Sequence, residues 1–223
     1  MMQEYFKRQI QLWGEEKQST LQKKKIAIIG AGGLGSSLCF ALGASGIGEI
    51  HIIDFDEVSL HNIHRQIAFT LEDEGKNKAQ VNAQIIRKRS QYTQAFFYEC
   101  DFEQWSLKDI DVDLIIDATD NLPTRAQIDQ YAKKKNIPWI YGSVEAFNGQ
   151  VCFFNTAKFE DFFKVVKRIP AGIAAPIVMH IASLQANLAI RYLTGLNVKK
   201  DFVYYIYFND EGEFISQKFS IKT

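Results

Sequence analysis

A glycine-rich loop and the polar residues after it are the part of this chain best suited to chemistry. The loop has the spacing Gly-x-Gly-x-x-Gly at Gly30, Gly32 and Gly35. Glycines permit a tight turn and a close approach of the backbone to phosphate, and the N-terminus of a following helix favours an anion. Asp54 lies about 20 residues further on, where a carboxylate commonly binds a ribose hydroxyl. The pattern predicts a nucleotide site, and taken alone it also fits an NAD-binding Rossmann unit.

The residues after the second expected strand favour ATP over NAD. Asp56 and the sequence Asn62-x-x-Arg65-Gln66 put a carboxylate, two amides and a guanidinium beside the glycine loop. An NAD enzyme needs no such phosphate clamp at this place. Lys78 opens the next expected helix, and as a point charge it suits a polyphosphate. It fits equally well a solvated lysine on a helix face.

A second acidic segment ends the fourth expected strand and reads Asp117-Ala-Thr-Asp120-Asn121. Asp120 suits a magnesium ion, because Mg²⁺ is a hard cation that prefers carboxylate and phosphate oxygens. It suits equally well the N-cap of a helix that begins near Pro123.

Strands and helices are expected to alternate along the chain. This order predicts an α/β fold: a Rossmann-like, doubly wound, mainly parallel sheet with a C-terminal β-hairpin. Ligands of such sheets bind outside the carboxyl ends of the strands, so Gly30, Asp54 and residues 117–120 should share one crevice. The expected strands are Lys25–Ile29, Glu49–Asp54, Ala95–Tyr98, Asp113–Asp117, Trp139–Tyr141, Gln150–Phe154 and the hairpin arms Phe202–Phe208 and Glu213–Ile221. The expected helices are Leu34–Ser45, Lys76–Ser90, Pro123–Lys135 and one that runs from Ile177 to Tyr192.

Length and composition limit the possible functions. The 223 residues predict one domain over residues 1–223, with an N-terminal helical arm over about residues 1–22. The 26 basic residues balance 26 acidic ones, so nothing draws the protein to nucleic acid or to an anionic membrane. Without an export signal or a run long enough to span a bilayer, we expect a soluble, cytoplasmic protein. Cys39, Cys100 and Cys152 form no C-x-x-C pair and fit buried apolar positions, so neither disulfides nor structural zinc are expected.

Together these residues resemble the ThiF/MoeB/HesA family of bacterial adenylyltransferases, which are related to ubiquitin-activating enzymes. The resemblance covers nearly the whole chain, from Tyr5-Phe-Lys-Arg8-Gln9 to Leu184-Gln185-Ala186. It implies ATP-dependent adenylation of the C-terminal glycine carboxylate of a small ubiquitin-like sulfur-carrier protein ending in Gly-Gly, of thiamine or molybdopterin type, with release of pyrophosphate. It also implies a homodimer in which Arg8 reaches the ATP of the partner subunit.

The resemblance implies roles for individual residues. Asp54 would bind the ribose, Asn121 would lie beside the adenosine, and Asp120 would coordinate magnesium. The residues implied to bind the nucleotide are Gly30, Gly32, Gly33, Asp54, Asp56, Asn62, Arg65, Gln66, Lys78, Asp120 and Asn121. The attacking carboxylate is already ionised at neutral pH, so the reaction needs alignment and positive charge rather than a general base. The residues expected to act in catalysis are Arg8, Arg65, Lys78 and Asp120.

The chain departs from the family pattern at its cysteines. Many members carry two C-x-x-C pairs that bind zinc, and this chain has neither, so no zinc is expected. Some members form a covalent link to the carrier through a cysteine after the Gly149-Gln150 strand. Residues 155–170 contain no cysteine, so the protein is expected to stop at the adenylate. The segment Phe159–Arg168 fits either a mobile loop near the carrier or a plain surface helix.

Other functions stay open. A tRNA- or peptide-modifying adenylyltransferase of the same superfamily is compatible with the loss of the zinc cysteines, although the balanced charge argues mildly against nucleic acid. A non-catalytic partner subunit of a heterodimer would supply only Arg8, and the complete site from Gly33 to Asp120 argues against it. An NAD dehydrogenase comes last, because no motif provides a catalytic acid or base.

Overall fold

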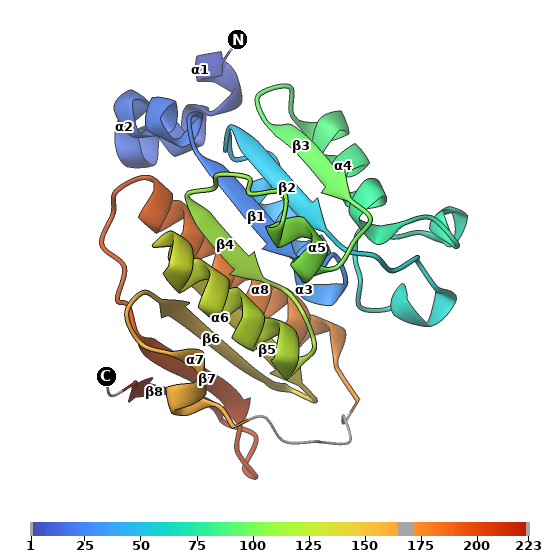
Figure 1. Cartoon of the computed structure of the whole chain (residues 1–223), viewed down its shortest axis with the longest axis vertical. Helices are drawn as coiled ribbons and strands as arrows, with labels where there is room; N and C mark the ends of the chain where they lie inside the picture. The colour runs from blue at the N-terminus through green and yellow to red at the C-terminus, as the bar shows by residue number, and fades with distance from the viewer. Residues whose placement is uncertain (1, 165–171, 222–223) are drawn as a thin grey trace.

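A computed structural model describes residues 2–164 and 172–221, which form one eight-stranded sheet in the order β3-β2-β1-β4-β5-β6-β7-β8 (Figure 1). The parallel strands are β3 (Gln94–Tyr98), β2 (Glu49–Ile53), β1 (Lys25–Ile29), β4 (Leu114–Asp117) and β5 (Trp139–Glu145). The antiparallel strands are β6 (Asn148–Phe154), β7 (Phe202–Phe208) and β8 (Phe214–Ser220). The expected doubly wound, mainly parallel sheet with a C-terminal hairpin is therefore confirmed.

Helices cover both faces of the parallel strands, which explains why these strands are almost continuously apolar. One face packs against α3 (Gly33–Leu42), α4 (Lys78–Arg89) and α8 (Ala175–Leu193). The other face packs against α5 (Phe102–Ser106), α6 (Leu122–Lys135) and α7 (Phe159–Phe162). Figure 1 shows α5 and α6 in front of the sheet and α3 and α8 behind it. Each side of the sheet therefore has its own hydrophobic core, and a smaller cluster is formed by Val58, Ala68, Phe69 and Val81.

The strand order places a crevice between β1 and β4. From β1 the chain moves outward to β2 and β3 in one direction, and later to β4 and β5 in the other. Since the loops after β1 and β4 leave toward opposite faces, side chains at the carboxyl ends of these strands meet around an open space.

The N-terminal segment folds into α1 (Met2–Tyr5) and α2 (Lys7–Leu21), and α2 is interrupted at Gly14, which has φ +85°. The connection between β2 and α4 contains two short 3₁₀ turns, η1 (Leu60–Asn62) and η2 (Leu71–Asp73). No helix in the described ranges combines the length and the apolar character that crossing a bilayer requires.

Most expected elements are present with ends shifted by a few residues. The expected strand over Trp139–Tyr141 is too short, because residues 142–145 continue β5 and pair with β6. The sequence pattern does not predict α5, whose five residues are too few to show a helical period. Gly195 ends α8: it has φ +73° and follows the C-cap residue Thr194, and the Leu196 N–H donates to the Arg191 carbonyl at 2.7 Å.

Candidate active site

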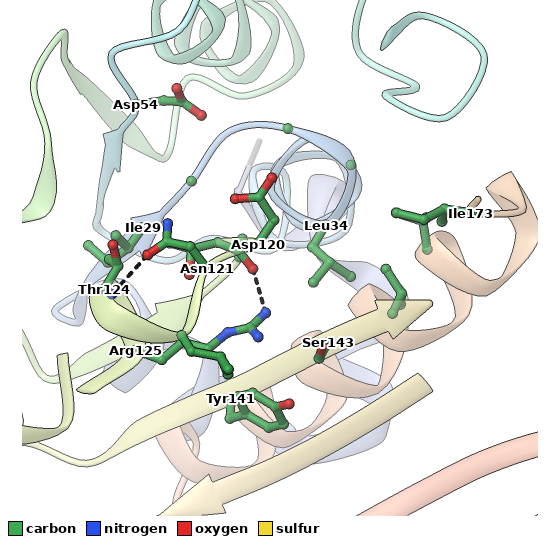
Figure 2. Close-up of a pocket in the computed structure, with 18 of the residues that line it drawn as sticks. Ile29, Leu34, Asp54, Asp120, Asn121, Thr124, Arg125, Tyr141, Ser143 and Ile173 are labelled. Carbon is green, nitrogen blue, oxygen red and sulfur yellow. Dashed lines mark hydrogen bonds between the residues drawn. The ribbon is translucent and has the colours of Figure 1, made fainter. Parts of the chain in front are cut away.

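The carboxyl ends of the parallel strands enclose a cavity of about 1320 Å³. It extends from the glycine loop across to the antiparallel strands, and Figure 2 shows residues from both parts of its lining. Of the residues implied to bind a nucleotide, those that line it are Gly30, Gly32, Gly33, Asp54, Asp56, Arg65, Gln66, Lys78, Asp120 and Asn121. The predicted common crevice for Gly30, Asp54 and residues 117–120 is therefore confirmed.

The glycine loop is packed too tightly for side chains. Gly30 has φ +96°, and a Cβ there would lie 2.6 Å from the carbonyl oxygen of Ala118 after β4. A Cβ at Gly35 would clash with the carbonyl oxygen of Gly30. The loop leads directly into α3, whose N-terminus has no side-chain cap and lies at the cavity wall with Gly32, Gly33 and Leu34, so this end suits an anion.

Asp54 is held beside the glycine loop by backbone donors. The N–H of Ala31 donates to its Oδ2 at 2.6 Å, and the N–H of Asp56 donates to its Oδ1 at 2.8 Å. Burial raises the pKa of Asp54, while these two hydrogen bonds and Lys78 oppose that rise. Each oxygen keeps a lone pair for a further donor, as a ribose hydroxyl would be.

Lys78 is a buried cation at the edge of the cavity, not a solvated lysine. It is 6% exposed, and its Nζ lies 2.7 Å from Oδ2 of Asp56, which is itself exposed. Asn77 fixes this end of α4, because its Oδ1 accepts the N–H of Gln80 and its Nδ2 donates to the Asp54 carbonyl. The ammonium group is thus positioned beside the carboxylates rather than free to move on a helix face.

The segment after η1 brings further polar groups to the same wall. Arg65 donates through Nη1 to the His61 carbonyl at 3.0 Å, and Nη1 lies 2.9 Å from Nε2 of His64. Gln66 is 5% exposed and its Oε1 is buried without a partner among the described residues. A Cβ at Gly32 would lie 3.2 Å from the Gln66 amide nitrogen, so the loop and this amide are in direct contact.

Asp120 and Asn121 have different structural roles in the loop after β4. The N-cap of α6 is Asn121, whose Oδ1 accepts the N–H of Thr124 at 2.9 Å, so the capping role considered for Asp120 is wrong. Asp120 is exposed and forms no hydrogen bond or ion pair with the described residues. Figure 2 shows its carboxylate projecting into the cavity, away from Arg125. Its oxygens are therefore available to a ligand.

A buried network supports this loop from below. Asp117 is fully buried and accepts hydrogen bonds from the Thr119 N–H, the Thr119 hydroxyl and Nε of Arg125. Burial raises the pKa of Asp117, and Arg125 opposes the rise. Gln185 of α8 donates to the Asp117 carbonyl at 2.7 Å, which ties the same strand end to the opposite helix layer.

The far half of the cavity lies over the antiparallel strands. Ser143, Gln150 and Tyr205 line it from β5, β6 and β7, and they are consecutive cross-strand partners on one face of the sheet. The hydroxyl of Tyr141 donates to Oε1 of Gln150 at 3.0 Å. This half therefore offers hydroxyl and amide groups on the face of a sheet, with Glu145 at the end of β5 and Lys164 also in its lining.

The comparison with protein families matches residues 6–222 to the family described as "ThiF family". The chain belongs to the ThiF family. It is 33% identical over 200 residues to a probable molybdopterin-synthase adenylyltransferase of Porphyra purpurea, covering 84% of this chain and 52% of that protein. It is 31% identical over 198 residues to the sulfur carrier protein ThiS adenylyltransferase of Escherichia coli, covering 84% of this chain and 78% of that protein. The chain spans about half the length of several relatives that it matches.

Solved structures show the same fold at lower identity. MccB of E. coli, crystallised with ATP, superposes with a TM-score of 0.80 at 24% identity, covering 92% of this chain and 66% of that one. MccB, which also matches in a further solved structure, is described there as a microcin C7 biosynthetic enzyme. These likenesses support the ThiF-family fold that the sequence match assigns.

Two of the residues expected at the site of this ThiF-family chain lie away from the cavity. Asn62, the last residue of η1, is buried and does not line the cavity. Arg8 is exposed on α2, donates to Oε1 of Gln11 at 3.0 Å, and is also absent from the lining. Figure 1 shows α2 near the amino ends of the parallel strands, at the opposite end from the cavity. The roles implied for Asn62 and Arg8 stay predictions.

The cysteines are placed differently from one another. Cys39 and Cys152 are buried, and burial raises the pKa of both thiols. Cys100 is only half-buried and lines the cavity, so the expectation that it is a buried core residue is wrong. Within residues 2–164 and 172–221, no three His, Cys, Asp or Glu side chains are grouped to bind a metal ion.

Sequence reasoning gives no role to Arg125, Ser143 or Tyr205, although all three line the cavity. Arg125 comes shortly after the segment Asp117–Asn121, but its burial becomes visible only in the fold. The segment Phe159–Arg168 begins with α7, and Phe163 and Lys164 line the cavity, while residues 165–168 lie outside the described residues.

Proposed function

We propose that this protein adenylates the C-terminal glycine carboxylate of a small ubiquitin-like sulfur-carrier protein ending in Gly-Gly, using ATP and releasing pyrophosphate. The observation that carries the proposal is the continuity of the cavity. Its first half has the glycine loop, Asp54, Lys78 and the Asp120 carboxylate, which has no partner among the described residues, and its second half has the polar side chains of Ser143, Gln150 and Tyr205. An adenylylating enzyme needs such adjoining sites for a nucleotide and an acyl group. The sulfur-carrier adenylyltransferases among the relatives support this choice of substrate.

The residues in the first half fit a magnesium ion. Mg²⁺ is usually held by one or two carboxylates, with the other ligands coming from substrate phosphates and water. Asp120 supplies one exposed carboxylate without a partner in the part of the chain that the structure describes, which suits this donor set. When bound, the ion would neutralise phosphate charge and so favour the departure of pyrophosphate.

The remaining chemistry depends on position and charge. An oxygen of the acyl carboxylate attacks the α-phosphorus, the bond from this phosphorus to the bridging oxygen breaks, and the electron pair leaves on pyrophosphate. No proton moves, so no general base is required. Lys78 and Arg65 supply positive charge toward the phosphates, and Asp54 orients the ribose. Their positions around the glycine loop support these roles.

A homodimer in which Arg8 acts on the partner's nucleotide is part of the proposal. Arg8 is exposed, and within residues 2–164 and 172–221 its side chain bonds to the neighbouring Gln11 through Nη1, so its guanidinium has donors left for another molecule. Its distance from the cavity of its own chain favours action across a subunit interface.

The protein is proposed to stop at the adenylate. Cys39 and Cys152 are enclosed in the two cores, and Cys100 is half-buried in the cavity lining. Burial raises the pKa of all three thiols, which disfavours the nucleophilic thiolate. Detection of a reducible adduct between the enzyme and a carrier would contradict this part of the proposal.

ATP–pyrophosphate exchange tests the function directly. A recombinant sulfur carrier ending in Gly-Gly should stimulate exchange of labelled pyrophosphate into ATP, and the same carrier without its last glycine should not. A series of short peptides with free C-termini forms the second arm, since the MccB fold likeness favours a peptide as the alternative acyl substrate. If a peptide stimulates exchange and the carrier does not, the proposed adenylation reaction stands, but its acyl substrate is a peptide and not the carrier. Absence of ATP binding would overturn the proposal.

A further inference from the structure

Arg125 is a buried arginine where the two halves of the cavity meet. It is 5% exposed, it projects from the second turn of α6, and it lines the cavity. Figure 2 shows it between the loop that carries Asp120 and Asn121 and the strand that carries Tyr141 and Ser143. A buried arginine needs several partners to offset the loss of hydration, so its partners indicate its purpose.

The hydrogen bonds of Arg125 join three separate pieces of backbone. Its Nε donates to Oδ2 of Asp117 at the end of β4, at 3.1 Å. Its Nη2 donates to the carbonyl of Thr119 at 2.6 Å and to the carbonyl of Gly142 in β5 at 3.1 Å. The guanidinium carbon also lies 5.0 Å from the centre of the Tyr141 ring. One planar group thus fixes the spacing between the loop before Asp120 and strand β5.

Strand β5, which Arg125 contacts on one face, is also held by a side chain on its other face. A Cβ at Gly142 would clash with the amide of Gln185, which is fully buried and bonded to the Asp117 carbonyl. Strand β5 therefore lies between Arg125 in front and Gln185 behind, and neither can move without loss of a buried hydrogen bond. Such a doubly held strand is a rigid reference for the loop.

We infer that Arg125 is a positioning residue, which sets the place of the Asp120 carboxylate relative to the acyl half of the cavity on β5. The inference rests on the proposed function, since it assigns the two halves to nucleotide and acyl group. Lysine cannot replace Arg125, because an ammonium group lacks the planar fork that reaches three acceptors at once. The effect acts through Asp120 and β5, so it should be seen in metal-linked binding and in the order of the loop.

The test compares ATP binding by calorimetry with Mg²⁺ and with EDTA, for wild type and Arg125→Lys. Arg87→Lys is the matched control, because Arg87 also donates twice to a backbone carbonyl, that of Ala95, but lies on α4 outside the cavity lining. We expect Mg²⁺ to strengthen ATP binding in wild type and in Arg87→Lys. In Arg125→Lys this strengthening should fall about tenfold or more, while binding in EDTA stays the same, since sub-ångström misplacement is costly only where geometry matters.

Amide hydrogen exchange of the protein without nucleotide gives a second readout. Residues 118–121 should exchange faster in Arg125→Lys than in wild type, and unchanged in Arg87→Lys. If Arg125→Lys does not fold, Thr119→Val provides the same test, because it removes only the hydroxyl bond to Asp117 and should lower the Mg²⁺ effect in the same direction.

The outcomes separate the two proposals. Wild type that does not bind ATP would end the proposed function and this inference with it. Wild type that binds ATP more tightly with Mg²⁺, together with variants that keep the full strengthening and the original exchange of residues 118–121, would overturn the role of Arg125 alone.

Discussion

The two halves of the cavity are built in different ways. The half around Gly30, Asp54 and Asp120 is made of loops that follow parallel strands, and it presents backbone N–H groups and charged side chains. The half around Gln150 and Tyr205 is the face of an antiparallel sheet, and Ser143, Gln150 and Tyr205 present a hydroxyl, an amide and a phenol there, with Glu145 at the end of β5. The first construction suits a compact, highly charged ligand, and the second suits an extended chain. Substitutions in the first half should therefore affect the nucleotide, and substitutions in the second half should affect the acyl substrate.

Loss of the Asp120 carboxylate should have the largest effect. Asp120→Ala is expected to lower the rate of adenylate formation about a thousandfold, because the charge on departing pyrophosphate is no longer offset. The fold should be unaffected, since Asp120 has no partner among the described residues. Pyrophosphate exchange and a thermal melt measure the two effects. Glu211→Ala, an exposed carboxylate in the β7–β8 turn, is the control and should keep full activity.

Lys78→Ala should come second, through ATP affinity. A charge-assisted hydrogen bond is worth about 1.5–3 kcal/mol, so the dissociation constant of ATP should rise about 10- to 150-fold. Lys76→Ala is the matched control, because Lys76 is two residues earlier, exposed, and paired with Asp73. Equal losses in the two variants, measured by calorimetry, would mean that Lys78 contributes no more than general surface charge.

Gln150→Ala should affect the acyl substrate only. Loss of one neutral hydrogen bond, worth about 1 kcal/mol, predicts a KM for the carrier raised about fivefold and an unchanged affinity for ATP. Gln217→Ala is the control, since Gln217 is on the same face of the sheet, two strands further out, and does not line the cavity. Weaker ATP binding in Gln150→Ala would contradict the claim that the two halves of the cavity bind different ligands.

The smallest expected effect is the pH dependence that Asp54 contributes to stability. Burial raises the pKa of Asp54 in the folded protein, so the protonated form is the one that folding favours. The contribution is fully present below the ordinary pKa of aspartate and is lost as the pH rises through the folded pKa. Wild type should therefore gain stability relative to Asp54→Asn as the solution is acidified from neutral pH. Denaturant unfolding at several pH values measures the difference, and a parallel pH dependence in both proteins would contradict it.

The same division explains what the sequence can predict. Gly30, Asp54 and Asp120 are predictable because each follows an apolar strand within one or a few residues, and parallel strands bring such positions to one edge. Gln150 and Tyr205 come together only through the pairing register of β6 and β7, which no local pattern specifies. Asn121 rather than Asp120 caps α6, a difference of one residue that sequence reasoning left open.

Burial is the other quantity that the sequence conceals. Arginine and glutamine are usually exposed, so nothing in the sequence marks Arg125 and Gln185 as buried. In the fold both are buried and belong to one hydrogen-bond network. Cys100 is the opposite case, because a residue expected in the core lines the cavity instead. The exposure of all three residues depends on which helices and strands pack together. The whole chain decides that packing, so no local pattern predicts it.

Strand β5 belongs to both constructions, and this has a consequence for insertions and deletions. Trp139 and Ile140 pair with β4 in the parallel part, and the whole strand pairs with β6 in the antiparallel part. Side chains alternate between faces, so removal of one residue after Ile140 would turn Ser143 toward α8 and bring apolar neighbours into the cavity. The turn over residues 209–212 carries no such constraint, since it joins β7 to β8 at an edge of the sheet. Natural length variation should therefore be absent from β5 and concentrate in that turn.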